Sequence, residues 1–386
     1  MTQIKIAVAG IGVVGSNVVK SLAAKKAYFS NKFNVDVEIV GISSRTKKDL
    51  PIKWYDNAIE MIDSEQPDIV CELIGGDSGI AHDIAIKTLS ESRVLITANK
   101  ALLAKEGENL LSLAKDNKTK LFFEAAVGGA VPIIQTISSN LNFNEIYSFG
   151  GILNGTANYI LTKMHEDKQN LADVIKIAQD LGLAESDPTF DICGIDASQK
   201  LAIINSLIYG VNFDVSNFTV TGIDKITLDD IKAAESFGAK IKLVASSELI
   251  DNILYSRVSP VFCSKDNFLF SIDNALNAAS FKTDMATDMT LISHGAGGIQ
   301  TAHAVITDIQ SSLSGIDSPR QNNLHKINNY QSLEFAGSLI VKTNEVNSEF
   351  NNNVKIGDYN YYLIENMKES KVKQLFSSDA TIFLHR

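Results

Sequence analysis

The start of the chain holds the feature that most constrains its fold, a short apolar run leading directly into a glycine-rich turn. Residues 4–9 are typical of a buried parallel strand, Gly10-Ile-Gly-Val-Val-Gly15 follows, and residues 16–24 predict a helix. In a dinucleotide-binding turn the first glycine permits the bend, the second lets a pyrophosphate approach, and the third lets helix and strand pack closely. A glycine-rich turn of another α/β protein is the alternative. The expected cofactor contacts are Gly10, Gly12, Val13, Val14 and Gly15.

The end of the next predicted strand, residues 37–42, bears on which cofactor is used. Sites that prefer NAD usually carry an acidic residue there, which binds the ribose 2′-hydroxyl. Here the chain continues Ser43-Ser-Arg-Thr-Lys47, with hydroxyls and cations and no acid. A 2′-phosphate suits this composition, so we expect NADP as the cofactor, with Ser43 and Arg45 among its contacts. A solvated basic loop is the alternative, and use of NAD as well stays open.

Alternating strands and helices continue beyond this point. Strands are predicted at 69–74, 93–97 and 121–124, with helices at 80–89 and 101–115, which indicates a parallel sheet with right-handed crossovers. Ligands of such sheets bind at the carboxyl ends of strands. The residues predicted at those ends are Thr97, Asn99, Lys100 and Glu124.

The pattern changes after residue 132 and predicts an inserted α+β domain. Its expected strands are 147–153, 217–223, 240–246 and 253–260, and its expected helices are 170–181 and 196–209. A glycine cluster then opens an apolar helix, which suggests a return to the nucleotide domain. We expect an α/β protein with a Rossmann-type nucleotide-binding domain (1–132 and 293–315), a substrate-binding and dimerisation domain (133–292) and a small C-terminal extension (316–386). The extension holds strand-like runs at 338–343 and 359–364, so we expect it to dock and to be dispensable for chemistry.

Residues 182–200 gather several charged side chains in one short segment. Asp196 opens a strongly apolar run that predicts a buried helix, and Lys200 lies at i+4 on the same helix face. An acid beside a lysine in the first turns of an apolar helix suggests a placed charge. An ordinary or structural ion pair is the alternative. The other acidic residues of the segment are Glu185, Asp187 and Asp191.

Composition excludes several classes of function. The 386-residue chain should form two or three domains, and its net charge of −10 argues against nucleic acid or an anionic membrane as partner. A strand begins almost at the first residue, no apolar run is long enough to span a bilayer, and the three cysteines are scattered; we therefore expect a cytoplasmic protein. The histidines lack metal-ligand spacing, and His165, His325 and His385 are expected at the surface.

Six segments together make the chain resemble homoserine dehydrogenases over about residues 4–310. They are Gly10–Gly15, Thr97–Lys100, Glu124–Pro132, Gly151–Ile160, Gly182–Lys200 and Gly295–Val305. The resemblance implies reversible oxidation of L-homoserine to L-aspartate 4-semialdehyde with NAD(P), on the route to threonine and methionine, by an expected homodimer. Leu183 stands where an aromatic residue is common, and the proline often found before Thr301-Ala302 is absent. The tail does not clearly match the regulatory domain that many members carry.

The resemblance also assigns roles to residues. Lys200 is expected to donate the proton or charge that stabilises the substrate oxygen, while Asp196 holds its ammonium or binds substrate, and Lys100 lies beside the nicotinamide and the substrate. Glu185 and Asp191 are candidate partners of the substrate ammonium, with turn capping as the alternative. Gly155 and Thr156 complete the expected substrate contacts, and Gly182, Glu185 and Gly297 the cofactor contacts. A monovalent cation such as sodium is expected at Glu124 and the carbonyls of Val127, Gly129 and Val131, a hard-oxygen ligand set, unless Glu124 only caps the turn.

Two other functions remain open at this stage. One is a different NADP-dependent amino-acid or semialdehyde dehydrogenase, although an acylating enzyme needs a nucleophilic cysteine, and neither Cys71 nor Cys263 has basic neighbours. The other is a non-catalytic NADP-binding sensor of the same fold, which would be expected to lose Lys200 or Asp196.

Overall fold

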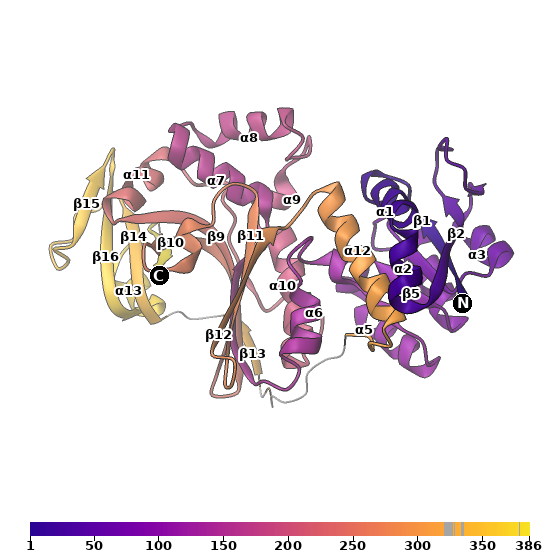
Figure 1. The fold of residues 1–386 in the computed structure, drawn as a ribbon. Coiled ribbons are helices and arrows are strands. Elements are labelled where there is room, and N and C mark those ends of the chain that lie inside the picture. Colours follow the sequence, from indigo (N-terminus) through magenta and orange to yellow (C-terminus); the bar gives the residue numbers. More distant parts are fainter. Residues whose placement is uncertain (320–326, 328, 333–335, 378) are drawn as a thin grey trace. The chain divides into compact units, whose positions relative to one another are not determined.

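A computed structural model describes residues 1–319, 327, 329–332, 336–377 and 379–386, and its chain divides into two compact units. Unit 1 comprises Met1–Glu145, Ala202–Asp214 and His294–Lys326; unit 2 comprises Ile146–Leu201, Val215–Ser293 and Ile327–Arg386 (Figure 1). These compact units differ from the functional domains expected from the sequence. Residues 202–214 group with unit 1, and residues 327–386 group with unit 2 rather than apart.

Unit 1 is built on a six-stranded sheet in the order β3-β2-β1-β4-β5-β6, with every pair parallel. This order is that of doubly wound dinucleotide-binding sheets. The chain adds β2 and β3 on one side of β1 and β4 to β6 on the other, and such sheets bind ligands at the point between β1 and β4 where the strand order changes side. All four residues of β4 are buried, as in a strand covered on both faces. The strands are β1 (Thr2–Ala9), β2 (Val35–Ser43), β3 (Trp54–Tyr55), β4 (Ile69–Glu72), β5 (Val94–Thr97) and β6 (Leu121–Phe122).

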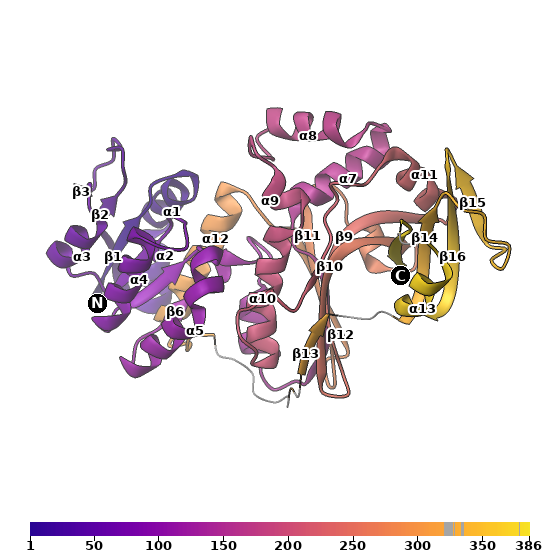
Figure 2. The same ribbon diagram turned by 180° about the vertical axis from the view of Figure 1, so that it is seen from behind.

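Helices cover this sheet, and the last of them comes from far along the chain. Val305 and Ile309 of α12 share a core with Val18 and Leu22 of α1, and the two helices lie side by side (Figures 1 and 2). The helix predicted after the glycine cluster therefore packs on the nucleotide-binding sheet. The helical elements of unit 1 are α1 (Val13–Ala24), α2 (Lys26–Phe33), α3 (Ala58–Glu65), α4 (Ile80–Ser90), α5 (Lys100–Asp116), η1 (Glu124–Ala126), α6 (Ile133–Gln135), η2 (Thr136–Asn140) and α12 (Gly298–Leu313).

Unit 2 contains a large mixed sheet in the order β12-β11-β7-β9-β10-β17-β14-β16-β15, with β8 and β13 pairing to β10. The long β9–β10 hairpin turns at Asp251-Asn252, both with positive φ, as a two-residue type I′ turn requires. The strands are β7 (Ile146–Ile152), β8 (Thr219–Val220), β9 (Ala239–Ile250), β10 (Ile253–Ser264), β11 (Leu276–Thr283), β12 (Asp288–His294), β13 (Asn329–Ser332), β14 (Ala336–Thr343), β15 (Asn353–Ile356), β16 (Tyr359–Lys368) and β17 (Thr381–His385).

The helical elements of the second half include the one that carries the acidic segment. The division between the units falls inside α10, whose apolar residues after Asp196 are buried as predicted. Helix α7, which the sequence analysis did not assign, packs on β9 and β11. The elements are α7 (Gly155–Asp167), α8 (Leu171–Asp180), α9 (Thr189–Ile192), α10 (Ile195–Tyr209), α11 (Leu228–Ser236), η3 (Phe268–Ser271) and α13 (Glu369–Leu375).

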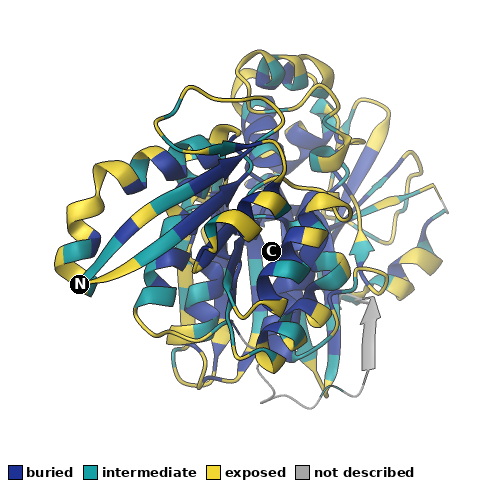
Figure 3. Ribbon diagram, turned by 90° about the vertical axis from the view of Figure 1, so that its right-hand side faces the viewer, coloured by how far each residue is buried: buried dark blue, intermediate teal, exposed yellow. Residues whose placement is uncertain are grey.

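The C-terminal extension is part of the core of unit 2. Leu339, Val341 and Tyr362 pack in one buried cluster with Ile152 and Val261 of the preceding strands. Strand β17 pairs in parallel with β10 and antiparallel with β14, so the extension continues the main sheet. Figure 3 shows the buried positions concentrated along strands and inner helix faces. The expected docking is therefore observed within the same chain.

The expectation that three histidines lie at the surface is wrong for His165, and His325 lies outside the described residues. His165 is 7% exposed, and its Nε2 accepts a hydrogen bond from the Ile241 N–H at 3.0 Å. His385 is partly buried, with burial lowering its pKa. The error arose because α7 was not recognised as a helix with one face against β9.

Candidate functional site

The glycine-rich turn of unit 1 has the geometry of a phosphate cradle. Gly10 has φ +101°, and its added Cβ would lie 2.5 Å from the Leu73 carbonyl oxygen; a Cβ on Gly15 would lie 2.0 Å from the Gly10 oxygen. Gly12 has open space within 4 Å of its Cβ position and is exposed at the N-terminus of α1. The first and third glycines thus permit close packing, and the second leaves room for a ligand, as the motif predicts. Val13 is exposed beside it.

The loop after β2 presents the predicted basic residues to solvent. Arg45 and Lys47 are exposed, whereas the Ser43 side chain is buried and its carbonyl accepts the Gly10 N–H at 2.8 Å. Ser44 is held by a hydrogen bond from Trp54 Nε1 at 3.3 Å. Arg45 and Lys47 are therefore accessible to an anionic group, while Ser43 ties the loop to the glycine turn.

The buried carboxylate of Glu72, which was not among the predicted site residues, binds groups at the ends of β4 and β5. Glu72, at the end of β4, is fully buried and accepts hydrogen bonds from the Ile74 N–H at 2.8 Å and the Thr97 hydroxyl at 2.7 Å. Asn99 caps α5 through the Leu102 N–H and donates to the Gly76 oxygen at 2.6 Å. Thr97 and Asn99 thus shape this edge of the sheet. Lys100 is the first residue of α5 and is partly exposed beside them.

Glu124 lies at the start of η1, just beyond β6, with its carboxylate buried. It accepts the backbone N–H groups of Ile134 at 3.0 Å and Gln135 at 2.6 Å, so it does cap the following turn. Burial raises its pKa to about 7, while these hydrogen bonds act in the opposite direction. Among the described residues no lysine or arginine pairs with it. A second buried carboxyl, Asp308 of α12, accepts the Glu124 N–H at 2.9 Å, and burial also raises the pKa of Asp308.

The segment after Glu124 is held mainly by backbone contacts. Ala130 N–H donates to the His294 oxygen at 3.0 Å, and the Val131 oxygen accepts the Ile133 N–H at 2.8 Å. Val127, Gly129 and Val131 supply carbonyl oxygens in this stretch, and all three residues are buried. Gly297 caps α12, and the adjacent Gly298 lies against Val13, so the structure brings Gly297 to the glycine-rich turn.

Asn154 joins the acidic segment to the first turn of α7 in unit 2. Its Nδ2 donates to Asp191 Oδ1 at 2.7 Å and to Asp196 Oδ2 at 2.8 Å, while its Oδ1 caps α7 by accepting the Ala157 N–H. Lys200 Nζ lies 2.8 Å from Asp196 Oδ2 and donates to the Leu153 oxygen at 2.9 Å. Lys200 and Asp196 are both largely buried. Asn154 lies within the Gly151–Ile160 segment of the resemblance but was not among the predicted site residues; its place directly before a helix was the available signal.

The remaining predicted residues of unit 2 lie on the approach to α7 and α9. The Thr156 hydroxyl donates to the Leu183 oxygen at 2.9 Å, which ties the 182–187 turn to α7. Glu185 and Gly182 are exposed, and Gln179 binds the Glu185 carbonyl rather than its carboxylate. Hydrogen bonds from the Thr189 side chain and from the Thr189 N–H lower the pKa of Asp187, which lies just before α9. The Glu185 carboxylate is thus available to solvent or ligand.

The described residues also bear on cysteine chemistry and on metal-ligating clusters. Burial raises the pKa of the Cys71 and Cys263 thiols to about 12, so neither is a thiolate nucleophile at neutral pH. Within the same described ranges, histidine, cysteine, aspartate and glutamate form no cluster of three suited to a metal ion. No helix among these residues is both long and apolar enough to cross a bilayer.

One hollow in unit 1 lies away from these groups. It is lined by Glu108, Lys115, Lys118 and Ser318, near the C-terminal end of α5 and the start of β6. Cofactors bind doubly wound sheets at the carboxyl ends of strands, which is the opposite edge. We therefore do not assign it to the cofactor.

Comparison with known proteins finds two family models that match successive parts of the chain. Residues 10–124 match the family model "Homoserine dehydrogenase, NAD binding domain", and residues 132–310 match "Homoserine dehydrogenase". A homoserine dehydrogenase of Helicobacter pylori is 34% identical over 98% of this chain and 92% of its own length. One of Methanocaldococcus jannaschii is 33% identical over 79% of this chain and 97% of its own length.

Solved structures agree. A homoserine dehydrogenase from Thiobacillus denitrificans covers 100% of this chain and 99% of its own with TM-score 0.91 at 24% identity, which shows the fold. One from S. aureus has TM-score 0.82 at 26% identity, over 100% of this chain and 99% of its own. A hyperthermophilic archaeal homoserine dehydrogenase in complex with NADPH has TM-score 0.70 at 26% identity, over 83% of this chain and 100% of its own. This chain belongs to the homoserine dehydrogenase family of NAD(P)-dependent oxidoreductases.

Proposed function

We propose that this oxidoreductase interconverts L-homoserine and L-aspartate 4-semialdehyde with NADP as its preferred cofactor, using Lys200 as the charged group at the reacting oxygen. The observation that carries the proposal is the buried Lys200–Asp196 pair at 2.8 Å, anchored by Asn154. On oxidation the substrate loses a hydride from C4 and a proton from its hydroxyl, and on reduction it regains both; the bound nicotinamide cofactor would accept or supply the hydride. A cation beside the oxygen stabilises the negative charge that develops there.

Asp196 and Asn154 position Lys200. Asp196 accepts hydrogen bonds from both the lysine and the Asn154 amide. The Leu153 oxygen accepts a further hydrogen bond from Lys200, so the ammonium is held on two sides. Lys100, at the start of α5 in the nucleotide-binding unit, is proposed to lie beside the nicotinamide and substrate. The alternative is that Lys200 and Asp196 form a buried ion pair that only stabilises the fold.

The substrate head group is proposed to bind at the acidic segment and the first turn of α7. Asp191 and Glu185 carry the negative charges that suit its ammonium, and the N–H groups near Gly155 and Thr156 suit its carboxylate. Asp191 is partly exposed and is oriented by Asn154. Glu185 and Gly182 also border the expected cofactor side.

NADP preference is proposed from the loop after β2. Arg45 and Lys47 are exposed cations where an NAD site carries an acid. The relative solved with NADPH supports use of that cofactor in the family. The residues that would hold it are those of the glycine turn and this loop, Thr97 at the end of β5, Asn99 at the N-terminus of α5 and Gly297 at the N-terminus of α12.

A monovalent cation such as sodium is proposed at Glu124 and the carbonyls of Val127, Gly129 and Val131. A buried carboxylate with no lysine or arginine paired to it among the described residues fits this role, since a bound cation would offset the desolvation cost that raises its pKa.

The chain is further proposed to act as a cytoplasmic homodimer. The functional partition into 1–132 with 293–315, 133–292 and 316–386 also stays a proposal.

Two alternatives are disfavoured by particular observations. An acylating semialdehyde dehydrogenase needs a reactive cysteine, and burial raises the pKa of all three thiols, including that of Cys193. A non-catalytic NADP sensor has no need of a buried lysine held by Asp196 and the Leu153 oxygen. Neither alternative accounts for Asn154.

The test is a spectrophotometric assay of the full chain with L-homoserine at alkaline pH. NADPH should form faster with NADP⁺ than NADH forms with NAD⁺ at equal concentrations. Repeating the assay in sodium, potassium and tetramethylammonium buffers of equal ionic strength tests the cation. Absence of turnover with either cofactor would overturn the activity, whereas equal rates in all three buffers would overturn only the cation.

A further inference from the structure

Asn277, near the start of β11, has a buried side-chain amide that the protein leaves unbonded. The residue is 1% exposed, and neither Oδ1 nor Nδ2 has a hydrogen-bond partner among the described residues. Leaving both groups unsatisfied costs roughly 1–3 kcal/mol for each. Native proteins rarely keep such a group without a ligand, a water or a functional reason.

The position of Asn277 connects it to the proposed substrate contacts within unit 2. The last pair between β11 and β7 is Ala278 with Ile152, so Asn277 lies one step further, level with Leu153. Leu153 supplies the carbonyl that binds Lys200. A Cβ on Gly155 would lie 3.3 Å from Asn277 Oδ1, so the amide touches the first residue of α7.

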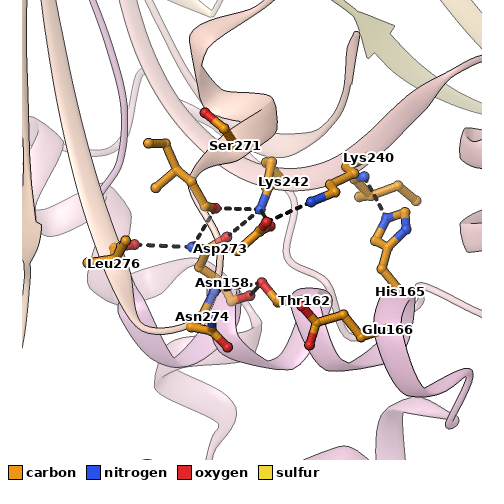
Figure 4. Close-up of polar contacts among 12 residues, drawn as sticks. Asn158, Thr162, His165, Glu166, Lys240, Lys242, Ser271, Asp273, Asn274 and Leu276 are labelled. Carbon is orange, nitrogen blue, oxygen red and sulfur yellow. Dashed lines mark hydrogen bonds and ion pairs between the residues drawn. The ribbon is translucent and has the colours of Figure 1, made fainter. Parts of the chain in front are cut away.

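The segment preceding Asn277 is firmly held, which fixes where the amide lies. Asn158 Nδ2 donates to the oxygens of Ile272 and Leu276, and Lys242 Nζ binds Asp273 Oδ1 at 2.8 Å (Figure 4). The Asn274 N–H donates to the Thr162 hydroxyl of α7. In contrast to Asn277, the amide of Asn158 is fully used, since its Oδ1 accepts from Lys242 at 3.2 Å.

We propose that Asn277 is a further substrate-contacting residue, whose amide hydrogen-bonds the carboxylate of the amino-acid substrate at the first turn of α7. The inference rests on the proposed substrate site. The helix N-terminus favours an anion there, and a neutral amide adds a donor without a competing charge. Gly155 approaches this segment closely, since an added Cβ there would lie 2.9 Å from the Ala275 oxygen, and this brings the first turn of α7 to the amide. The same geometry explains why an unpaired amide persists in this core.

The test compares Asn277→Leu with Asn158→Leu, two nearly isosteric changes of buried asparagines in one unit. For Asn277→Leu we expect the KM for L-homoserine to rise by about 10- to 100-fold, as expected for a lost hydrogen bond to a charged group, with the KM for NADP⁺ within about 2-fold. Its melting temperature should hold or rise, because no protein hydrogen bond is removed. For Asn158→Leu we expect a lower melting temperature and little change in the KM for L-homoserine.

A second readout separates substrate contact from stability. Inhibition by L-2-aminobutyrate, which keeps the carboxylate, is compared with inhibition by propan-1-amine, which lacks it. Wild type should favour the amino acid, and both Asn277→Leu and Asn277→Asp should lose most of that preference. An unchanged preference, or a loss of stability matching Asn158→Leu with normal KM, would assign Asn277 to an internal water and overturn the proposal. Turnover of wild type tests the proposed activity independently.

Discussion

At the scale of single residues, Lys200 carries the clearest expectation. Lys200→Ala should lower kcat by about 10²- to 10³-fold, because removing one charge-stabilising donor costs roughly 2–4 kcal/mol in the barrier. Cofactor affinity should persist, since the glycine turn belongs to the other unit. The measurement is steady-state turnover of L-homoserine together with NADPH fluorescence titration.

Lys176→Ala is the matched control for this change. Lys176 is exposed on α8 and is expected to leave kcat unchanged. Because Lys200 is buried against Asp196, the melting temperature of Lys200→Ala must be measured as well. A folded variant with near-wild-type turnover would remove Lys200 from the mechanism.

Arg45 is the residue on which cofactor choice should depend. Arg45→Ala should raise the KM for NADP⁺ by about 10-fold, because one charged contact at an exposed site is lost. The KM for NAD⁺ should stay nearly unchanged. Lys20→Ala, an exposed cation on α1, is the control for a general loss of positive charge. Equal effects of Arg45→Ala on both cofactors would contradict a role in 2′-phosphate binding.

At the scale of elements, His165 makes the packing of α7 against β9 sensitive to pH. Burial lowers the pKa of His165 from 6.5 to about 4, and its neutral Nε2 accepts the Ile241 N–H. As the pH falls, His165 is protonated near pH 6.5 in the unfolded chain but only near pH 4 in the folded chain. This contribution is therefore complete above pH 6.5 and is lost as the pH falls toward 4, by about 3 kcal/mol in total.

Urea unfolding followed by circular dichroism between pH 7 and pH 4.5 measures this dependence. His165→Gln, which keeps an acceptor and cannot be protonated there, should show a shallower loss of unfolding free energy on acidification. His303→Gln, at an exposed position of α12, should retain the wild-type slope. Identical slopes for wild type and His165→Gln would show that other groups govern acid stability.

At the scale of the whole molecule, the C-terminal extension is a structural part of unit 2. Leu339 is fully buried in its core, so Leu339→Ala should cost about 2–5 kcal/mol of unfolding free energy. Val346→Ala, at an 85% exposed position in the same extension, should cost almost nothing. Thermal and urea unfolding of the full chain give both values.

The outcome also bears on how the chain can be shortened. Deleting the residues after 315 would remove buried side chains such as Leu339 and Tyr362, so loss of folding is expected before loss of chemistry. An unchanged unfolding free energy for Leu339→Ala would mean that the extension unfolds independently.

The sequence by itself determined the elements whose chemistry is local. The Gly10–Gly15 turn follows from sterics, since Gly10 needs positive φ and Gly15 touches the Gly10 oxygen. The pairing of Lys200 with Asp196 follows from i+4 spacing on a helix, and the burial of α10 follows from its apolar run. Alternating strands and helices likewise predicted the parallel sheet.

Only the tertiary structure decided which distant residues meet. Asn154 contacts Asp191 and Asp196 across about forty positions of sequence, Asp308 reaches Glu124, and β17 joins β10. Local propensity carries no information about such pairs, because their free energy comes from burial and from hydrogen bonds formed only once the sheets assemble. His165 and Asn277 illustrate the same limit: a polar residue type suggests exposure, and packing against β9 or Gly155 places each one inside.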